Sequence, residues 1–511
     1  APFFSHFSEG LEAVKLTLFV GLYLLCTVAI GLFAATRVRS TTDYALAGRS
    51  LPLVMVITAT FATWFGSETV LGLPGQFIKN GLEGVVEEPF GSSMALILVG
   101  MFFARKLYRM SLLTIGDFYR RRYGVSVELC CSIFVVLSYL GWVAAQVAAL
   151  GLVIHLLTEG YVSVSNAMIV GTIVVLIYTV FGGMWSVALT DFFQMIIIVI
   201  GLVLVAYFAG SMAGGPGKVT EYAVQNDLFR ILPENNFKSW MFWISAAITM
   251  MIGSLPQQDV FQRVMSAKSE KIACYGPILG GSFYLLFAFV PMFIVIAATV
   301  GAPELASKLM ADAPQEILPT FIKEYMPLWL RIMFFGAVLS AVMSTASATM
   351  LAPTTTFVEN VLRNLMPLSD QRELKAMRIS LVVFAIGVLT YALLMEGTPI
   401  YELAAMAYQF PVIGAFWPLT LGLYWKRSTT LGCWLSIIAG SAVWGVLSFT
   451  GLGEEFPALL GGFLAAGIGQ IVGSLLPLRM NRECVRNWQE NKDKYLYIAQ
   501  RSEERRVGKE C

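Results

Sequence analysis

The sequence predicts an all-α membrane protein, and three observations lead to that prediction. Hydrophobic residues make up 57% of the 511 residues, charged residues make up only 13%, and the mean hydropathy is +0.71. Soluble domains are roughly 45–50% apolar and about a quarter charged. Apolar segments recur along the whole chain, and the loops between them alternate in their content of lysine and arginine.

A membrane-spanning helix needs about 20 mostly apolar residues, and thirteen segments of this sequence qualify. They cover residues 12–35, 51–78, 84–104, 127–157, 164–183, 189–212, 239–262, 273–299, 327–362, 376–395, 399–424, 430–450 and 456–477. Because these segments leave no room for a sizeable soluble domain, we expect a membrane protein that is not an enzyme.

The basic residues predict how the segments are oriented. They cluster after the first, third, seventh, ninth, eleventh and thirteenth segments, for example at Arg37 and Arg39, at residues 120–122, and at Arg479 and Arg482. Short loops rich in lysine and arginine face the cytoplasm. We therefore expect a multi-pass protein of the plasma (inner) membrane with its N-terminus outside and its C-terminus cytoplasmic. The sequence has no basic stripe of the kind that binds nucleic acid.

The second segment contains a stretch that does not suit a continuous membrane helix. Residues 62–72, ATWFGSETVLG, carry a glutamate, two glycines and three hydroxyl residues, and Pro74 and Gly75 follow. Backbone groups cannot stay unpaired in hydrocarbon, so a break is tolerated only where it faces protein, water or an ion. A plain kink is the alternative, since glycine and proline are frequent in membrane helices.

A second interruption of the same kind lies at residues 249–263, TMMIGSLPQQDVFQR. Each interruption opens a block of five segments, which cover residues 51–212 and 239–424. Matching interruptions in two halves point to an inverted-repeat transporter with its site between the halves. The remaining parts are residues 1–50 with one extra helix and a cytoplasmic loop, residues 425–478 with two more helices, and a cytoplasmic tail over residues 479–511.

Residues 339–351, LSAVMSTASATML, place hydroxyl side chains at helical spacing among small residues. Small residues of this kind also let membrane helices pack closely, which is the alternative interpretation. The functional interpretation is that the Ser344 and Thr345 hydroxyls offer hard oxygen ligands to Na⁺. Unwound carbonyls of the first broken helix would complete the coordination shell.

Four stretches resemble the sodium:solute symporter family, which includes proline, galactose, sialic acid and choline transporters. They are TTDYALAGRSLP (residues 41–52), YTVFGGMWSVALTDFFQ (178–194), FQRVMSAKS (261–269) and AVMSTASATML (341–351). The resemblance runs over about residues 12–477. It implies a LeuT-type fold, a 5+5 inverted repeat with one extra helix before the core and two after it.

The resemblance also implies ligands for the coupling ion. They are the carbonyls of Ala62, Phe65 and Ala341 and the hydroxyls of Ser344 and Thr345. Some relatives that use a second sodium have a serine where this chain has Ala341. Asp191 is similar to a family aspartate linked to sodium release or a second ion; the alternative is that Asp191 is an interfacial helix N-cap.

The solute is expected at mid-membrane beside the broken helices. The candidate residues are polar or aromatic side chains of the predicted spans: Trp64, Glu68, Glu88, Trp142, Gln146, Gln257 and Gln409, together with Asp259, Tyr408 and Trp417. Trp64 and Trp142 resemble tryptophans of choline transporters, which hold a quaternary ammonium by cation–π attraction. Ordinary helix packing is the alternative for both rings. These residues favour a small polar organic solute, cationic or zwitterionic.

The sequence therefore predicts a sodium-coupled symporter that imports this solute by alternating access. The alternative is the membrane sensor of a symporter-like histidine kinase truncated before its kinase part. The last eleven residues, 501–511, are similar to a translated sequencing adapter, and we expect them to be artefactual.

Overall fold

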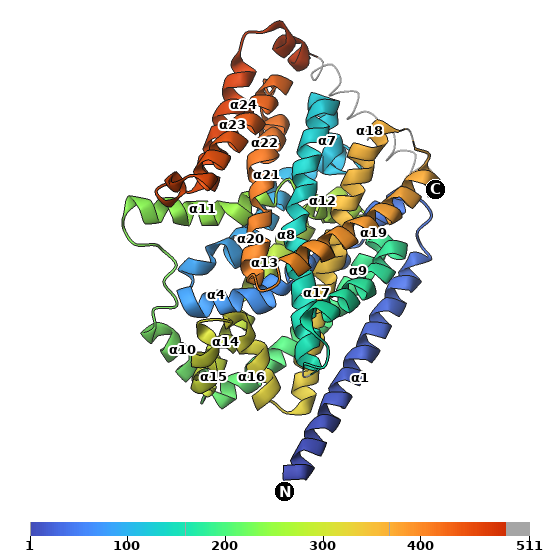
Figure 1. Ribbon diagram of the computed structural model, residues 1–511. Helices are drawn as coiled ribbons and strands as arrows, with labels where there is room; N and C mark the ends of the chain where they lie inside the picture. Colours follow the sequence, from blue (N-terminus) through green and yellow to red (C-terminus); the bar gives the residue numbers. More distant parts are fainter. Residues whose placement is uncertain (1, 159, 367, 487–511) are drawn as a thin grey trace.

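The computed structural model describes residues 2–158, 160–366 and 368–486, so the end of the predicted tail, with the adapter-like residues 501–511, lies outside the described residues. Helices make up the described part of the chain, and its β-structure is limited to an isolated bridge between Leu51 and Ala267. Figure 1 shows the helices gathered in one bundle, with α1 (Pro2–Ala35) along one side of it.

Nine of the described helical segments are long and apolar enough to cross a membrane, and two bent pairs raise the number to eleven. Six of the nine are single elements, of which α9 contains a kink: α1, α8 (Val125–Leu157), α9 (Val164–Met212), α19 (Asp370–Leu394), α23 (Thr430–Phe449) and α24 (Ala458–Leu475). The other three join shorter pieces: η3–α6 (Glu83–Arg109), α13–α14 (Glu270–Gly301) and α17–α18 (Leu328–Leu365).

Two places account for the difference between these eleven and the predicted thirteen. Helix α9 has 49 residues, about 73 Å at 1.5 Å per residue, which is more than twice the roughly 30 Å of a bilayer core. Gly183 interrupts it with φ 50° and ψ −141°, between the predicted segments 164–183 and 189–212. The predicted segment 399–424 is divided among three short helices, α20 (Ile400–Ala407), α21 (Gln409–Gly414) and α22 (Phe416–Tyr424).

Both predicted interruptions are confirmed as bends. Helix α3 (Leu53–Trp64) and the segment formed by η2 (Glu68–Gly72) and α4 (Leu73–Asn80) meet at 56°. Helices α11 (Phe237–Gly253) and α12 (Gln258–Ser266) meet at 44°. The turn η2 is π-helical, a form that is rare and frequently marks functional sites.

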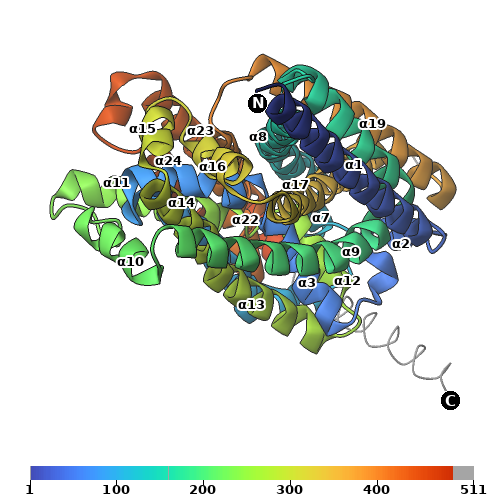
Figure 2. The same cartoon turned by 90° about the horizontal axis from the view of Figure 1, so that it is seen from below.

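Helix α17 (Leu328–Phe357) lies in the middle of the bundle. Figure 2 shows it surrounded by α1, α8 and α9, and residues 341–350 are all buried. Helices α1 and α9 bond to it directly: the Tyr23 and Ser340 hydroxyls lie 2.5 Å apart, and the Tyr178 hydroxyl donates to the Met343 carbonyl at 3.1 Å. The small side chains of residues 339–351 allow this close packing.

Candidate functional site

The break after α3 exposes backbone groups that side chains from other helices then satisfy. Phe65 has φ −82° and ψ 67°, so the helix stops there. The Ser67 amide donates to Gln146 Oε1 of α8 at 2.9 Å, and the Trp64 carbonyl accepts the Thr69 hydroxyl at 3.1 Å. The break is therefore held by side-chain partners, as buried irregular backbone requires.

The structure brings three of the predicted ion-site residues together at this break. The Ser344 and Thr345 hydroxyls of α17 lie 3.0 and 3.3 Å from the Ala62 carbonyl oxygen. A Cβ on Gly66 would lie 2.6 Å from Thr345 Oγ1, so α17 approaches too closely for any side chain there. Hard oxygens of two helices thus face each other in a fully buried place.

The other predicted ion-site residues surround this contact. Phe65, at the break itself, and Ala341, one turn before Thr345 in α17, are both fully buried. Asp191 belongs to the interior of α9, so its interpretation as a helix N-cap is wrong. Its Oδ1 accepts the Ser344 hydroxyl at 2.5 Å, and its buried Oδ2 has no hydrogen-bond partner in the described residues.

Three aromatic rings form a buried cluster on the other side of the break. The Trp64 ring centroid lies 5.7 Å from that of Trp142 and 6.0 Å from that of Tyr408, and the last two are 5.3 Å apart. Tyr139 stacks on Trp142 at 6.0 Å. Because Trp64 is two residues from Ala62, one break carries both the oxygen contact and the aromatic cluster.

Glu68 lies beside these rings and is 2% exposed. Its Oε1 accepts the Trp142 indole N–H at 2.9 Å, and its Oε2 accepts the Gln146 amide at 2.7 Å and the Ser67 hydroxyl at 3.3 Å. All three bonds come from neutral donors. The structure thus places a buried carboxylate, bonded only to neutral groups, against an aromatic cluster.

A second carboxylate, Glu88, is buried near the first. The hydroxyls of Thr69 and Tyr284 both donate to its Oε1, and these two hydroxyls are 2.9 Å apart. Tyr284 was not among the residues predicted from the sequence. A tyrosine in the middle of an apolar helix is a usable signal, because a buried hydroxyl needs a polar partner.

The second bend supplies a further polar group. Gln257 donates to the Ser138 hydroxyl at 3.3 Å, one helical turn from Trp142. Asp259 accepts the Tyr139 hydroxyl at 2.5 Å, and Arg263 donates to the Asp259 carbonyl at 2.8 Å and to the Thr63 hydroxyl at 2.5 Å. Several buried polar atoms of this region have no hydrogen-bond partner in the described residues, among them Trp64 Nε1, Gln257 Oε1, Asp259 Oδ2 and Arg263 Nε.

Two predicted solute residues lie elsewhere. The Gln409 amide oxygen accepts the indole N–H of Trp444 on α23 at 2.9 Å. Trp417 donates to the Phe463 carbonyl and stacks on the Phe463 ring of α24, so its placement at the solute site is wrong. Trp417 serves the packing of the C-terminal helices, whereas Gln409 also lines a cavity, because a helix presents successive residues to different neighbours.

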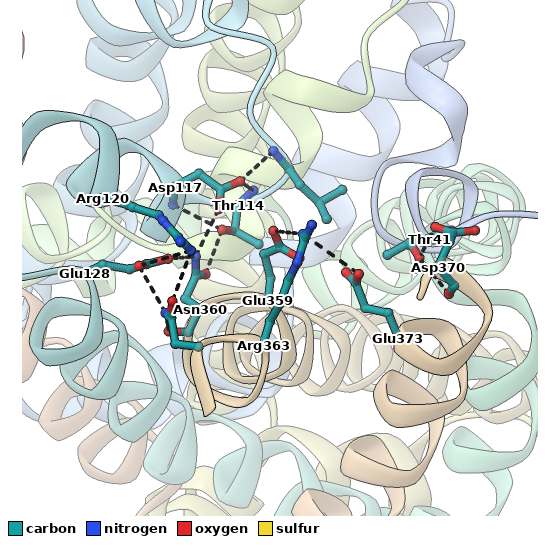
Figure 3. A network of polar contacts seen from close by, with 12 residues as sticks. Thr41, Thr114, Asp117, Arg120, Glu128, Glu359, Asn360, Arg363, Asp370 and Glu373 are labelled. Atoms are coloured by element: carbon teal, nitrogen blue, oxygen red, sulfur yellow. Dashed lines mark hydrogen bonds and ion pairs between the residues drawn. The ribbon is translucent and has the colours of Figure 1, made fainter. Parts of the chain in front are cut away.

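Another polar network lies at one end of the bundle, where α7 (Ile115–Tyr123), α8 and the end of α17 meet (Figure 3). Asn360 donates to Asp117 at 3.0 Å and to Glu128 at 2.9 Å, and it accepts the Thr114 hydroxyl at 2.7 Å. Burial raises the pKa of the Asp117 carboxyl, and the nearby Glu359 carboxylate adds to the rise. Two backbone amides and Asn360 oppose that rise by bonding to its ionised form.

Comparison with known proteins identifies the family. The model of the sodium:solute symporter family matches residues 44–440. The high-affinity choline transporter 1 of Drosophila melanogaster is 27% identical over 80% of this chain, which spans about two thirds (66%) of that protein. The sodium/pantothenate symporter of Escherichia coli is 25% identical over 89% of this chain and 96% of its own.

A solved structure shares the fold. The substrate-bound, outward-open form of a Na⁺-coupled sialic acid symporter has a TM-score of 0.77 at 19% identity, and the match covers 91% of this chain and 98% of the other. The predicted fold class is thereby confirmed. The chain belongs to the sodium:solute symporter family, whose members are Na⁺-coupled membrane transporters and not enzymes.

Proposed function

We propose that this symporter imports a small organic cation together with Na⁺ by alternating access. One observation carries the proposal: Glu68 and Glu88 are both 2% exposed and are bonded to neutral donors, beside a cluster of aromatic rings. A charged side chain at the membrane centre costs about 2.5–3.5 kcal/mol or more unless it is compensated. A cationic solute supplies that compensation.

The aromatic cluster supports the same solute class. An ammonium group over the faces of Trp64, Trp142 and Tyr408 gains about 0.5–2 kcal/mol of cation–π attraction per face. The unpartnered Trp64 Nε1, Gln257 Oε1 and Asp259 Oδ2 provide a donor and two acceptors for polar parts of the solute. A choline-like cation satisfies these groups, whereas the carboxylate of pantothenate would face two like charges.

We further propose that Na⁺ binds between the break and α17. Its ligands are the carbonyls of Ala62, Phe65 and Ala341 and the hydroxyls of Ser344 and Thr345. Asp191 orients the Ser344 hydroxyl and supplies negative charge near the ion. Hydroxyl and carbonyl oxygens suit an alkali cation that must be released again.

Coupling follows from the shared break. Sodium holds residues 62–65 against α17, and the solute then contacts Trp64 and Glu68 of the same segment. If bound sodium raises the affinity for the solute by some factor, then bound solute raises the affinity for sodium by the same factor. At 100 mV each positive charge moved inward contributes about 2.3 kcal/mol, so a cationic solute adds its own driving force to that of the ion.

Two separate groups of loop contacts support the proposed orientation of the protein in the membrane. Contacts among the basic loops include Arg49 with the Tyr108 carbonyl, Arg109 with Glu270, and Thr41 with Asp370. Contacts among the other loops include Lys79 with the Ala311 carbonyl, Glu83 with Arg230, and Lys238 with Glu455. Figure 3 shows Thr41 and Asp370 of the first group in the same region as Asp117 of α7, and Figure 1 shows the N-terminus of α1 at the end of the bundle opposite α7. By the positive-inside rule the α7 end faces the cytoplasm of the plasma (inner) membrane, so the N-terminus is outside.

An uptake assay in proteoliposomes tests the solute class. Choline, its neutral isostere 3,3-dimethylbutan-1-ol and pantothenate would each be supplied with and without an inward Na⁺ gradient. We expect Na⁺-dependent accumulation of choline or of another quaternary ammonium, and none of the neutral isostere. Na⁺-driven uptake of pantothenate with no uptake of any ammonium compound would contradict the proposal.

A further inference from the structure

Two cavities meet at Glu87, on the side of the molecule that we assign to the exterior. One has a volume of about 710 Å³ and reaches Lys79, Asn226 and Arg230. The other has a volume of about 570 Å³ and reaches Gln409 and Glu454. Glu87, Phe242 and Ala246 line both of them.

The contacts that hold the neighbouring polar side chains in place do not include the Glu87 carboxylate oxygen Oε2. Its Oε2 is inaccessible to solvent and has no hydrogen-bond partner in the described residues. The next residue, Glu88, turns its carboxylate inward to Thr69 and Tyr284. Consecutive carboxylates thus face two compartments, the cavities and the buried solute site.

The neighbouring charged groups of the larger cavity already have partners. Glu83 is paired with Arg230 at 2.9 Å, and the Lys79 ammonium donates to the Ala311 carbonyl at 3.2 Å. Glu87 therefore differs from Glu83 although both line the larger cavity. An ion pair explains Glu83, and the fold gives no such explanation for Glu87.

Tyr401 is a second group without a partner at the same place. It is 8% exposed, its hydroxyl has no hydrogen-bond partner in the described residues, and the Glu87 and Glu88 carboxylates are its charged neighbours. Its backbone lies against the first broken helix, since a Cβ on Gly72 would be 3.1 Å from the Tyr401 amide nitrogen. Tyr401 thus lies near Glu87 and against the break, although it lines neither cavity itself.

We propose that Glu87 and Tyr401 form an outer binding position, where the ammonium group of the solute is held before it reaches Glu88 and Glu68. The inference rests on the proposed function, because it requires a cationic solute. A cleft with low-dielectric walls and a net negative group concentrates cations and speeds their entry. The Glu87 carboxylate attracts the charge, and the Tyr401 hydroxyl serves an oxygen of the solute or of its hydration shell.

The first test compares Glu87→Gln with Glu454→Gln in choline uptake. Both changes remove one negative charge from the cavity walls, but Glu454 is exposed at the rim. We expect Glu87→Gln to raise the KM for choline about fivefold, to leave the maximal rate nearly unchanged, and to reduce the inhibition of uptake by salt. The Glu454→Gln protein should behave as wild type. Equal KM values in both variants would overturn the proposal.

The second test measures binding and does not depend on transport. Equilibrium dialysis of radiolabelled tetramethylammonium against the full-length protein should show a tight and a weak saturable component. Glu68→Gln should remove the tight component and Glu87→Gln the weak one. Loss of neither component in Glu87→Gln, or displacement of the weak component by equimolar Na⁺, would overturn an organic-cation position there. If the wild-type protein shows neither component, the result would contradict the proposed function as well.

Discussion

Two buried polar regions of this protein differ in how completely their groups are satisfied. In the α7-end cluster, defined here as Asp117, Glu128 and Asn360, every carboxylate oxygen accepts at least one hydrogen bond (Figure 3). In the central cluster, defined here as Glu68, Asp191 and Asp259, two of the carboxylates each keep an oxygen without a partner. Buried polar groups are normally paired, so the second pattern points to ligands and the first to structure.

The contrast also separates the parts that should be rigid from the parts that should move. The α7-end cluster ties α7, α8 and the end of α17 together, and a fully satisfied network of this kind holds one arrangement. The central cluster joins α17 and α9 to the broken helices, whose freed backbone groups bond to side chains of other helices. Alternating access needs a rigid frame and a movable part. We assign the α7-end cluster to the frame and the central cluster to the movable part.

The largest effect is expected where the satisfied cluster is disrupted. Asn360→Ala removes hydrogen bonds from Asp117 and Glu128 and leaves two buried carboxylates short of partners, which should cost about 3 kcal/mol. Thermal unfolding of the detergent-solubilised protein measures the loss, with Gln225→Ala on an exposed helix as control. An unchanged melting temperature in Asn360→Ala would show that this cluster does not stabilise the frame.

A smaller effect, confined to the solute, is expected at Glu68. Glu68→Gln keeps the shape and removes the charge, and should weaken choline or tetramethylammonium binding about thirtyfold, or about 2 kcal/mol. The apparent sodium affinity, measured in the absence of solute, should change much less. The paired carboxylate of Glu83 gives the control, Glu83→Gln. Full solute affinity in Glu68→Gln would remove this residue from the binding site.

The next smaller effect is expected at the ion site, on the affinity for sodium. Ser344→Ala or Thr345→Ala deletes one hydroxyl from the Ala62 contact and should lower the apparent sodium affinity about tenfold. Ser347→Ala is a matched control, because the Ser347 hydroxyl is equally buried but bonds to the Ser344 carbonyl of its own helix. Sodium dependence identical to wild type in both site variants would exclude this coordination.

The smallest effect is expected at the aromatic rings. Trp64→Phe keeps an aromatic face and loses the larger indole, so cation affinity should fall about threefold. Trp417→Phe, whose ring stacks on Phe463 away from the site, should leave affinity unchanged. A comparison of choline binding in the two variants measures this; an equal decrease in both would indicate a packing effect rather than cation–π attraction.

The sequence predicted the parts of the site that depend on unusual residues in apolar surroundings. Glycine, proline and a glutamate within residues 62–75 marked the break, and hydroxyls in residues 339–351 marked its partner helix. Their contact, the Ala62 carbonyl with the Ser344 hydroxyl, is present in the structure. The role of these residues as ion ligands, and the boundaries of the two five-helix repeats, stay predictions.

The remaining features depend on which side of a helix a residue occupies, and composition does not encode this. Gln409 follows Tyr408 directly, yet Tyr408 joins the aromatic cluster while Gln409 bonds to Trp444. Tyr284 and Tyr139 were missed because their polar partners, Glu88 and Asp259, belong to distant parts of the sequence and become apparent only in the fold. The predicted loop at residues 184–188 is helical, and the chain changes direction at Gly183 instead, where φ 50° and ψ −141° interrupt α9.

The most direct test measures the affinity for tetramethylammonium as a function of Na⁺ concentration, in the wild-type and Ser344→Ala proteins. If one interrupted helix carries both ligands, Na⁺ should tighten tetramethylammonium binding in the wild type, and about tenfold more Na⁺ should be needed for the same effect in Ser344→Ala. Affinity that does not vary with Na⁺ in the wild type, or that varies equally in both proteins, would contradict the claim that one interrupted helix binds both ion and solute.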